Sequence, residues 1–158
     1  MKYYIFLFTI FMSQIFFAQD ILMFYPEGQE SYNGGNVQFY KDFNQILKEK
    51  NLKPCEDKNE TYSFGVLINP DNKINFVADD ESYEDKKNKC AKDLSREVAK
   101  YLKGWNAATK DGKKVPAVAR FLIIPNQLFG TLKDGFDLEK DRNETLPEFP
   151  GGIPEFRK

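Results

Sequence analysis

Two cysteines, Cys55 and Cys90, are the pair of side chains whose type and spacing most directly suggest chemistry. In an oxidising compartment such a pair is a candidate disulfide, and two buried free thiols are the alternative. As zinc ligands the two thiolates would need further partners, and the chain contains no histidine to supply them. The pair therefore indicates either a structural cross-link or two free thiols. We predict no metal site and no bound cofactor.

An acidic run at residues 79–89 is the second group that could bind a ligand. Its carboxylates are Asp79, Asp80, Glu81, Glu84 and Asp85. The spacing lacks the glycine and the terminal glutamate of an EF-hand calcium loop, and lysines follow immediately. We interpret the run as a solvated connection between two elements.

Enzymatic chemistry has little support in the composition. Without histidine, no Ser-His-Asp or Cys-His set can form, and the usual general base near neutral pH is absent. The cysteine spacing excludes a C-x-x-C redox motif, and no glycine-rich phosphate-binding phrase is present. We predict that the chain is not an enzyme and has no small-molecule substrate. A small secreted enzyme that uses carboxylates is the alternative.

The N-terminal residues have the features of a secretory signal peptide. Lys2 is followed by an apolar run from Tyr3 to Phe17, and a small residue, Ala18, precedes the expected cleavage point. This run has fifteen residues, whereas a membrane-spanning helix needs about 20. We therefore predict a signal peptide at residues 1–18, with an uncleaved membrane anchor as the alternative.

The charge balance excludes one class of partner. Removing residues 1–18 takes away one lysine, so the formal net charge changes from −1 to −2. Nucleic-acid binding requires a strongly basic surface, which this chain does not have. We therefore predict no nucleic-acid partner.

Two amphipathic helices are indicated by apolar residues that recur every three or four positions. The first is predicted at residues 36–50, with an apolar face of Phe39, Tyr40, Phe43, Ile46 and Leu47. The second is predicted to end at the only tryptophan, with an apolar face of Cys90, Leu94, Val98, Tyr101, Leu102 and Trp105.

Three strands are indicated by alternating, β-branched and aromatic residues. Residues 62–68 and 74–78 flank an Asn-Pro-Asp-Asn turn and predict a β-hairpin. Residues 115–124 predict the last strand, which follows a turn at Asp111-Gly112. The fold class is therefore predicted as α+β, in the order α-β-β-α-β. In this arrangement two helices pack on one face of a three-stranded antiparallel sheet.

The remaining segments are expected to connect or to end the domain. Residues 20–35 are interpreted as a short lead-in. Residues 130–146 are rich in glycine and charge and have weak periodicity, which predicts a linker. Residues 147–158 form a terminal tail.

The order and spacing of these motifs resemble the C-terminal domain of TonB, in the form common in the Bacteroidetes group of bacteria. The resemblance covers roughly residues 26–129, which we predict to form one domain. It rests on Gly34-Gly35, on Phe39 and Phe43 of the first helix, on Trp105, on Ala107-Ala108 and on Gly112-Lys113-Lys114-Val115.

The tail resembles the start of a second domain of the same kind. The glycines of Phe149-Pro150-Gly151-Gly152 align with Gly34-Gly35, and Phe156 and Lys158 align with Phe39 and Lys41 at the same offset. Residues 147–158 are therefore interpreted as the beginning of a repeat.

The resemblance implies a non-catalytic, exported protein-binding module in the periplasm or at the outer membrane. Its expected partner is an envelope protein or an extended peptide, which would add a strand to the edge of the last strand. The candidate binding residues on that strand are Val118, Arg120 and Leu122. A second copy of the chain, giving a homodimer, is a further candidate partner.

The departures from the family pattern limit what the resemblance implies. Ala107 stands where a proline usually follows the tryptophan. The chain has neither the histidine nor the proline-rich spacer expected of a TonB energy transducer. The resemblance therefore implies the fold and protein binding. A membrane-anchored TonB-type energy transducer for outer-membrane transport is the alternative.

Overall fold

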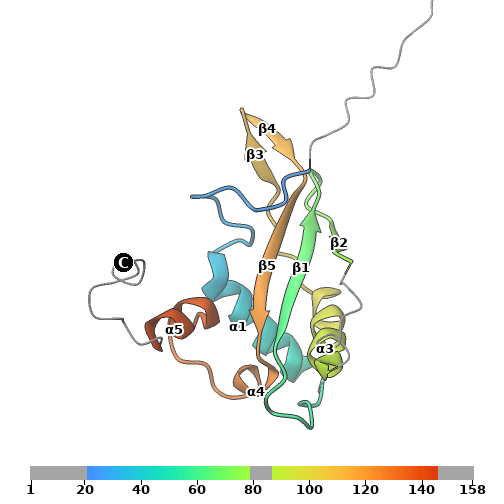
Figure 1. The fold of residues 1–158 in the computed structure, drawn as a ribbon, viewed down its shortest axis with the longest axis vertical. Coiled ribbons are helices and arrows are strands. Elements are labelled where there is room, and N and C mark those ends of the chain that lie inside the picture. Colours follow the sequence, from blue (N-terminus) through green and yellow to red (C-terminus); the bar gives the residue numbers. More distant parts are fainter. Residues whose placement is uncertain (1–20, 79–86, 146–158) are drawn as a thin grey trace, which may run out of the picture.

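A three-stranded antiparallel sheet organises the computed structural model of this chain, which describes residues 21–78 and 87–145 (Figure 1). The described strands are β1 (Tyr62–Ile68), β2 (Ile74–Phe76), β3 (Ala108–Lys110), β4 (Lys113–Val115) and β5 (Ala117–Ile123). The described helices are α1 (Gly35–Glu49), α3 (Lys89–Ala99), α4 (Pro125–Leu128) and α5 (Leu138–Thr145). The predicted signal peptide, the predicted tail and most of the acidic run lie outside the described residues.

The strand order of the main sheet is β2-β1-β5, with β1 in the centre. β1 pairs with β5 over seven residues, from Tyr62 opposite Ile123 to Ile68 opposite Ala117. Alternate residues of β1 are buried on one face, so the predicted alternation is confirmed. The α+β class and the three-stranded antiparallel sheet are therefore confirmed.

Helix α1 begins at the second of two glycines and packs on the buried face of the sheet. Gly34 and Gly35 have φ angles of 84° and 67°, which glycine adopts without steric cost. The apolar face predicted for this helix is buried throughout, and its boundaries agree with the prediction within one residue. Amphipathic spacing was a sufficient signal here, because the helix has a single apolar side.

An aromatic cluster joins α1 to the sheet. The Phe39 and Phe121 rings stack with centroids 3.9 Å apart, and Tyr32 meets both Phe39 and Trp105 edge to face. We call this set the aromatic core: Tyr32, Phe39, Tyr40, Phe43, Trp105 and Phe121.

The predicted second helix is shorter than expected. Helix α3 ends at Ala99, six residues before Trp105, and Tyr101 is exposed with the Lys50 ammonium over its ring. Trp105 is buried, but its backbone lies in a bridge with Tyr32 that is flanked by two backbone hydrogen bonds. The helical spacing of the buried residues was therefore misleading, because Leu102 and Trp105 enter the core from an extended segment.

The strand predicted at residues 115–124 is β5, which begins two residues later than predicted, and Val115 belongs to a separate strand, β4. Pro116, which has no N–H to donate, separates β4 from β5. Strand β4 pairs with β3 in a separate hairpin, which was not predicted. Its turn is at Asp111-Gly112 as predicted, and both residues have positive φ, as a tight two-residue hairpin turn requires.

The segment predicted as a linker is part of the folded domain over its described residues. Residues 130–145 contain α5, and Leu138 at its start is 2% exposed within the hydrophobic core. Helix α4 before it contributes Leu128, which is also fully buried. The weak periodicity of this segment concealed its role, since one or two buried residues per short helix produce no repeating pattern.

Gly104 is a position where close packing excludes a side chain. A Cβ atom there would lie 2.5 Å from the Tyr32 ring, so we expect Gly104→Ala to lower the free energy of unfolding by about 1–3 kcal/mol. Urea denaturation measures this loss. Gly130→Ala is the matched control, because nothing lies within 4 Å of its added Cβ. Equal stability of the two variants would contradict the predicted clash.

Within the two described ranges, no helix combines the length and apolar character that a bilayer-spanning segment needs.

Candidate functional site

The outer edge of β5 is the candidate binding site. β5 ends the strand order of the main sheet, so only one of its sides is paired with β1. In an antiparallel strand the N–H and C=O of one residue point the same way, and successive residues alternate. Val118 donates its N–H to a segment outside the sheet, so Val118, Arg120 and Leu122 direct their backbone groups to the outer edge.

One end of this edge is paired with residues 21–25, which we call the Leu22 segment. Leu22 forms a parallel bridge with Ala117. Its N–H donates to the Pro116 carbonyl at 3.0 Å, and its carbonyl accepts from the Val118 N–H at 2.8 Å. The Leu22 segment crosses the start of β5 in Figure 1.

The other end of the edge is occupied by two side chains. The Tyr40 hydroxyl donates to the Leu122 carbonyl at 2.9 Å, and the Glu139 carboxylate lies near the Leu122 N–H, which lowers the pKa of that carboxyl group. Tyr40 thus satisfies the outward carbonyl of Leu122 in the way that the backbone of a neighbouring strand would. Glu139 belongs to α5, so this helix lies against the end of β5.

Both side chains have shifted pKa values with identifiable causes. Burial raises the pKa of Tyr40 far above its usual value, and the charges of Glu139 and Asp137 raise it further. Tyr40 therefore stays a neutral donor. The pKa of Glu139 is also raised, first by burial and then by the charge of Asp137, while hydrogen bonds from Leu122 and Asn36 lower it by less.

The Glu139→Gln variant is expected to remove a pH dependence of stability. Because the pKa of Glu139 is raised in the folded state, the protonated carboxyl group contributes stability. This contribution to the free energy of unfolding is complete below the ordinary pKa of 4.5 and is lost as pH rises through the folded-state pKa. Glutamine has nearly the same shape, keeps one acceptor oxygen and does not titrate. The difference in free energy of unfolding, variant minus wild type, should therefore be more positive at about pH 7 than at about pH 4. Urea denaturation of both proteins at the two pH values measures it.

Asp137→Asn is the matched control for this prediction. Its side-chain oxygen accepts from the Glu139 and Lys140 N–H groups at the start of α5, and asparagine can take over that capping role. Removing the Asp137 charge should lower the raised pKa of Glu139 toward its ordinary value. The pH dependence of stability should then be weaker than in wild type, as in Glu139→Gln but to a smaller extent. A Glu139→Gln variant whose stability follows wild type at both pH values would contradict the raised pKa of the Glu139 carboxyl group.

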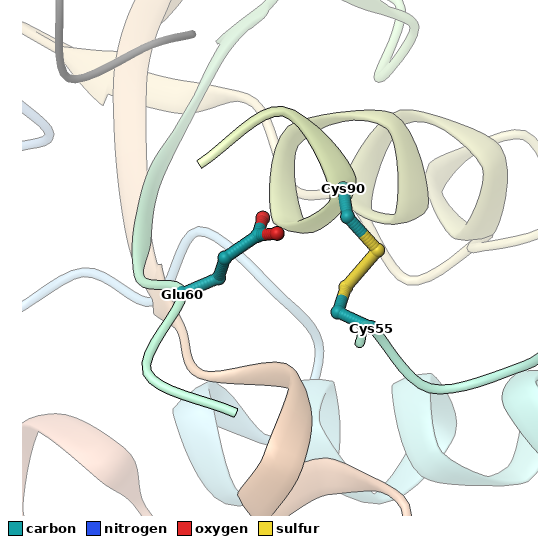
Figure 2. Close-up of side chains that lie close together, drawn as sticks. All are labelled: Cys55, Glu60 and Cys90. Carbon is teal, nitrogen blue, oxygen red and sulfur yellow. A yellow bond between two sulfur atoms is a disulfide. The ribbon is translucent and has the colours of Figure 1, made fainter. Parts of the chain in front are cut away.

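The two cysteines form a disulfide at the start of α3 (Figure 2). Cys55 and Cys90 have a Cα–Cα distance of 5.8 Å and are 35 residues apart in sequence. Next to the bridge, the Glu60 carboxylate accepts the Ala91 N–H at 2.8 Å. A carboxylate is favourable there because the first-turn N–H groups of a helix lack intrahelical acceptors. The disulfide and Glu60 thus attach the segment between α1 and β1 to the start of α3.

Cys55, Glu60 and Cys90 also form the group of potential metal ligands found in the described residues. One ligand atom from each lies within 4.8 Å of the others. Because the two sulfur atoms are bonded to each other, neither is a thiolate that could bind a cation. The disulfide predicted from sequence therefore accounts for this cluster.

A small cavity opens between α1 and the segment that follows α3. Its volume is about 230 Å³, and Asp42 and Tyr101 are among its lining residues. The Asp42 carboxylate already accepts hydrogen bonds from Tyr32 and Gln38. Drug-sized ligands usually occupy pockets of about 300–1,000 Å³. The cavity therefore gives no basis for assigning a ligand.

The three candidate edge residues share one strand but differ in their surroundings. Val118 is buried, Leu122 is partly buried, and Arg120 is exposed with its guanidinium near the Met23 carbonyl, at 3.4 Å. Sequence analysis did not identify Leu22, Tyr40 or Glu139 as their partners. The apolar run from Ile21 to Tyr25 was a usable strand signal, whereas Glu139 is one acid among many.

No family model, no curated protein and no solved structure matches this chain.

Proposed function

We propose that this chain is an exported, non-catalytic protein-binding module of the TonB C-terminal type. It binds an extended segment of another envelope protein, which adds as a strand to the outer edge of β5. The observation that carries the proposal is this edge, where Val118, Arg120 and Leu122 direct their backbone groups away from β1.

Two further features support the proposal. The order α1, β1, β2, α3 and β5 follows the order implied by the resemblance, with the last strand at the edge of the sheet. The disulfide suits the oxidising compartment to which a signal peptide would direct the chain.

A site-specific cross-linking experiment tests the binding edge. A photoreactive amino acid replaces Arg120 in the full-length chain, and the control replaces Lys114 in β4, which is also exposed. In native envelopes we expect position 120 to cross-link to a defined segment of one protein, and position 114 not to do so. A synthetic copy of that segment should then slow amide exchange of Arg120. Protection that appears elsewhere would contradict binding at β5.

The intact mass of the protein from its native host tests export. A mass that begins at Gln19 and increases by about two hydrogens on reduction supports an exported protein with the Cys55–Cys90 bridge. A mass that retains Met1 would contradict the cleaved signal and would favour the membrane-anchored alternative.

A further inference from the structure

The Leu22 segment leaves little of the β5 edge free for a partner. Leu22 pairs with the edge at Pro116 and Val118, and the Tyr40 hydroxyl binds the Leu122 carbonyl, with the Glu139 side chain nearby. Between them, Arg120 is the outward-facing residue of β5 for which no backbone partner is found among the described residues. One residue is too short to support an added strand. Any strand that pairs along β5 must therefore displace one of the two coverings.

The Leu22 segment is the weaker of the two coverings. Of its apolar side chains, Ile21, Met23 and Phe24 are exposed, and Leu22 is only half-buried. Its attachment to β5 rests on two backbone hydrogen bonds and one long contact from Arg120. Tyr40, by contrast, is fully buried in the aromatic core, so it cannot leave without disrupting that core.

The segment also has an anchor beyond the edge. The Tyr25 hydroxyl donates to the Asn106 carbonyl at 2.9 Å. The Gln29 amide side chain then bonds both the N–H and the carbonyl of Thr109. Residues 21–24 can therefore leave β5 while the chain stays attached at Tyr25.

We propose that the Leu22 segment is an internal competitor that covers the β5 edge and must be displaced before a partner strand binds. This inference rests on the proposed function and adds its regulation. A tethered competitor acts at an effective concentration on the order of millimolar, so free peptides bind the covered edge weakly. Arg120 keeps a short gap open from which displacement can begin.

The test compares Leu22→Pro with Met23→Pro in the full-length chain. Proline at position 22 removes the N–H that bonds Pro116. Proline at position 23 removes an N–H for which no acceptor is found among the described residues, and it favours an extended Leu22. Circular dichroism and urea denaturation test whether both variants keep the core, to which neither Leu22 nor Met23 belongs.

The first measurement is amide exchange of the free proteins. We expect the Val118 amide to be protected in wild type and in Met23→Pro, and to exchange about tenfold faster in Leu22→Pro. If the Val118 amide of Leu22→Pro exchanges at the wild-type rate, the Leu22 segment does not cover the β5 edge. Equal acceleration in both variants would overturn the role of the Leu22 hydrogen bonds.

The second measurement is binding of a fluorescent peptide that copies residues 20–25, Asp-Ile-Leu-Met-Phe-Tyr. We expect it to bind Leu22→Pro about tenfold more tightly than wild type or Met23→Pro. Equal affinity for all three proteins would overturn competition by the internal segment. Faster Val118 exchange without peptide binding to any protein would instead overturn strand addition at β5, and with it the proposed function.

Discussion

Replacing Phe39 by alanine is expected to lower the free energy of unfolding by about 3–5 kcal/mol. Phe39 is fully buried at the centre of the aromatic core, where its ring stacks on Phe121 of β5. It also contacts Tyr32, which precedes α1, and Trp105, which lies between α3 and β3. The truncation therefore removes apolar contacts from three segments and leaves a cavity that the neighbouring rings cannot fill.

Urea denaturation of the oxidised protein measures this loss. Val37→Ala is the matched control, because Val37 lies in the same helix with 41% of its surface exposed, and its change should stay within about 0.5 kcal/mol. Small domains typically have a free energy of unfolding of only about 5–15 kcal/mol, so Phe39→Ala should remove a large fraction of it. A loss below about 1 kcal/mol would show that α1 does not depend on this stack.

Removing the disulfide is expected to cost roughly 3–4 kcal/mol of stability. The bridge joins residues 35 apart, and the closed loop contains both β1 and β2. In the chain-entropy model, the cross-link stabilises the fold by restricting the unfolded chain, and the effect grows slowly with loop length. The double variant Cys55→Ala/Cys90→Ala should show this loss in urea denaturation.

Reduction of the wild-type protein provides an independent comparison. Wild type in excess reductant should match the double variant, whereas the double variant should not respond to reductant. Glu60→Gln tests the neighbouring contact separately, because the amide oxygen can still accept the Ala91 N–H and little stability should be lost. A double variant within about 1 kcal/mol of wild type would contradict the stabilising role of the bridge.

The sequence predicted the elements that have one regular apolar face. Helix α1 and strand β1 each bury a single side, so the spacing of their apolar residues gave both the type of element and its buried face. The Cys55–Cys90 disulfide, one of two alternatives at that stage, agrees with an even pair of cysteines in a chain that we predict to be exported.

The errors arose where burial does not follow a repeating pattern. Leu102 and Trp105 are buried at intervals that imitate a helix, although their segment is extended and pairs with Tyr32. Strand β3 has only three residues, and Leu138 is the described residue through which α5 enters the core. Such contacts depend on distant partners, so local propensity does not reveal them.

The candidate edge could be located from sequence, but its coverings could not. The resemblance to the TonB C-terminal domain pointed to the last strand and so to Val118, Arg120 and Leu122. The pairing of Leu22 with Val118 joins residues almost 100 positions apart, and the hydrogen bond from Tyr40 to Leu122 joins a helix to a distant strand. Neither contact has a local signature in the chain.

The disulfide also determines how the domain would respond to a pulling force. When tension is applied between the Leu22 segment and α5, the load passes through the Cys55–Cys90 bond and bypasses the loop that contains β1 and β2. At about 3.3–3.6 Å per extended residue, the closed loop would add roughly 120 Å to the stretched chain if the disulfide were absent. β5 lies outside the loop, so after the Leu22 segment has detached from β5 the disulfide does not prevent β5 from separating from β1.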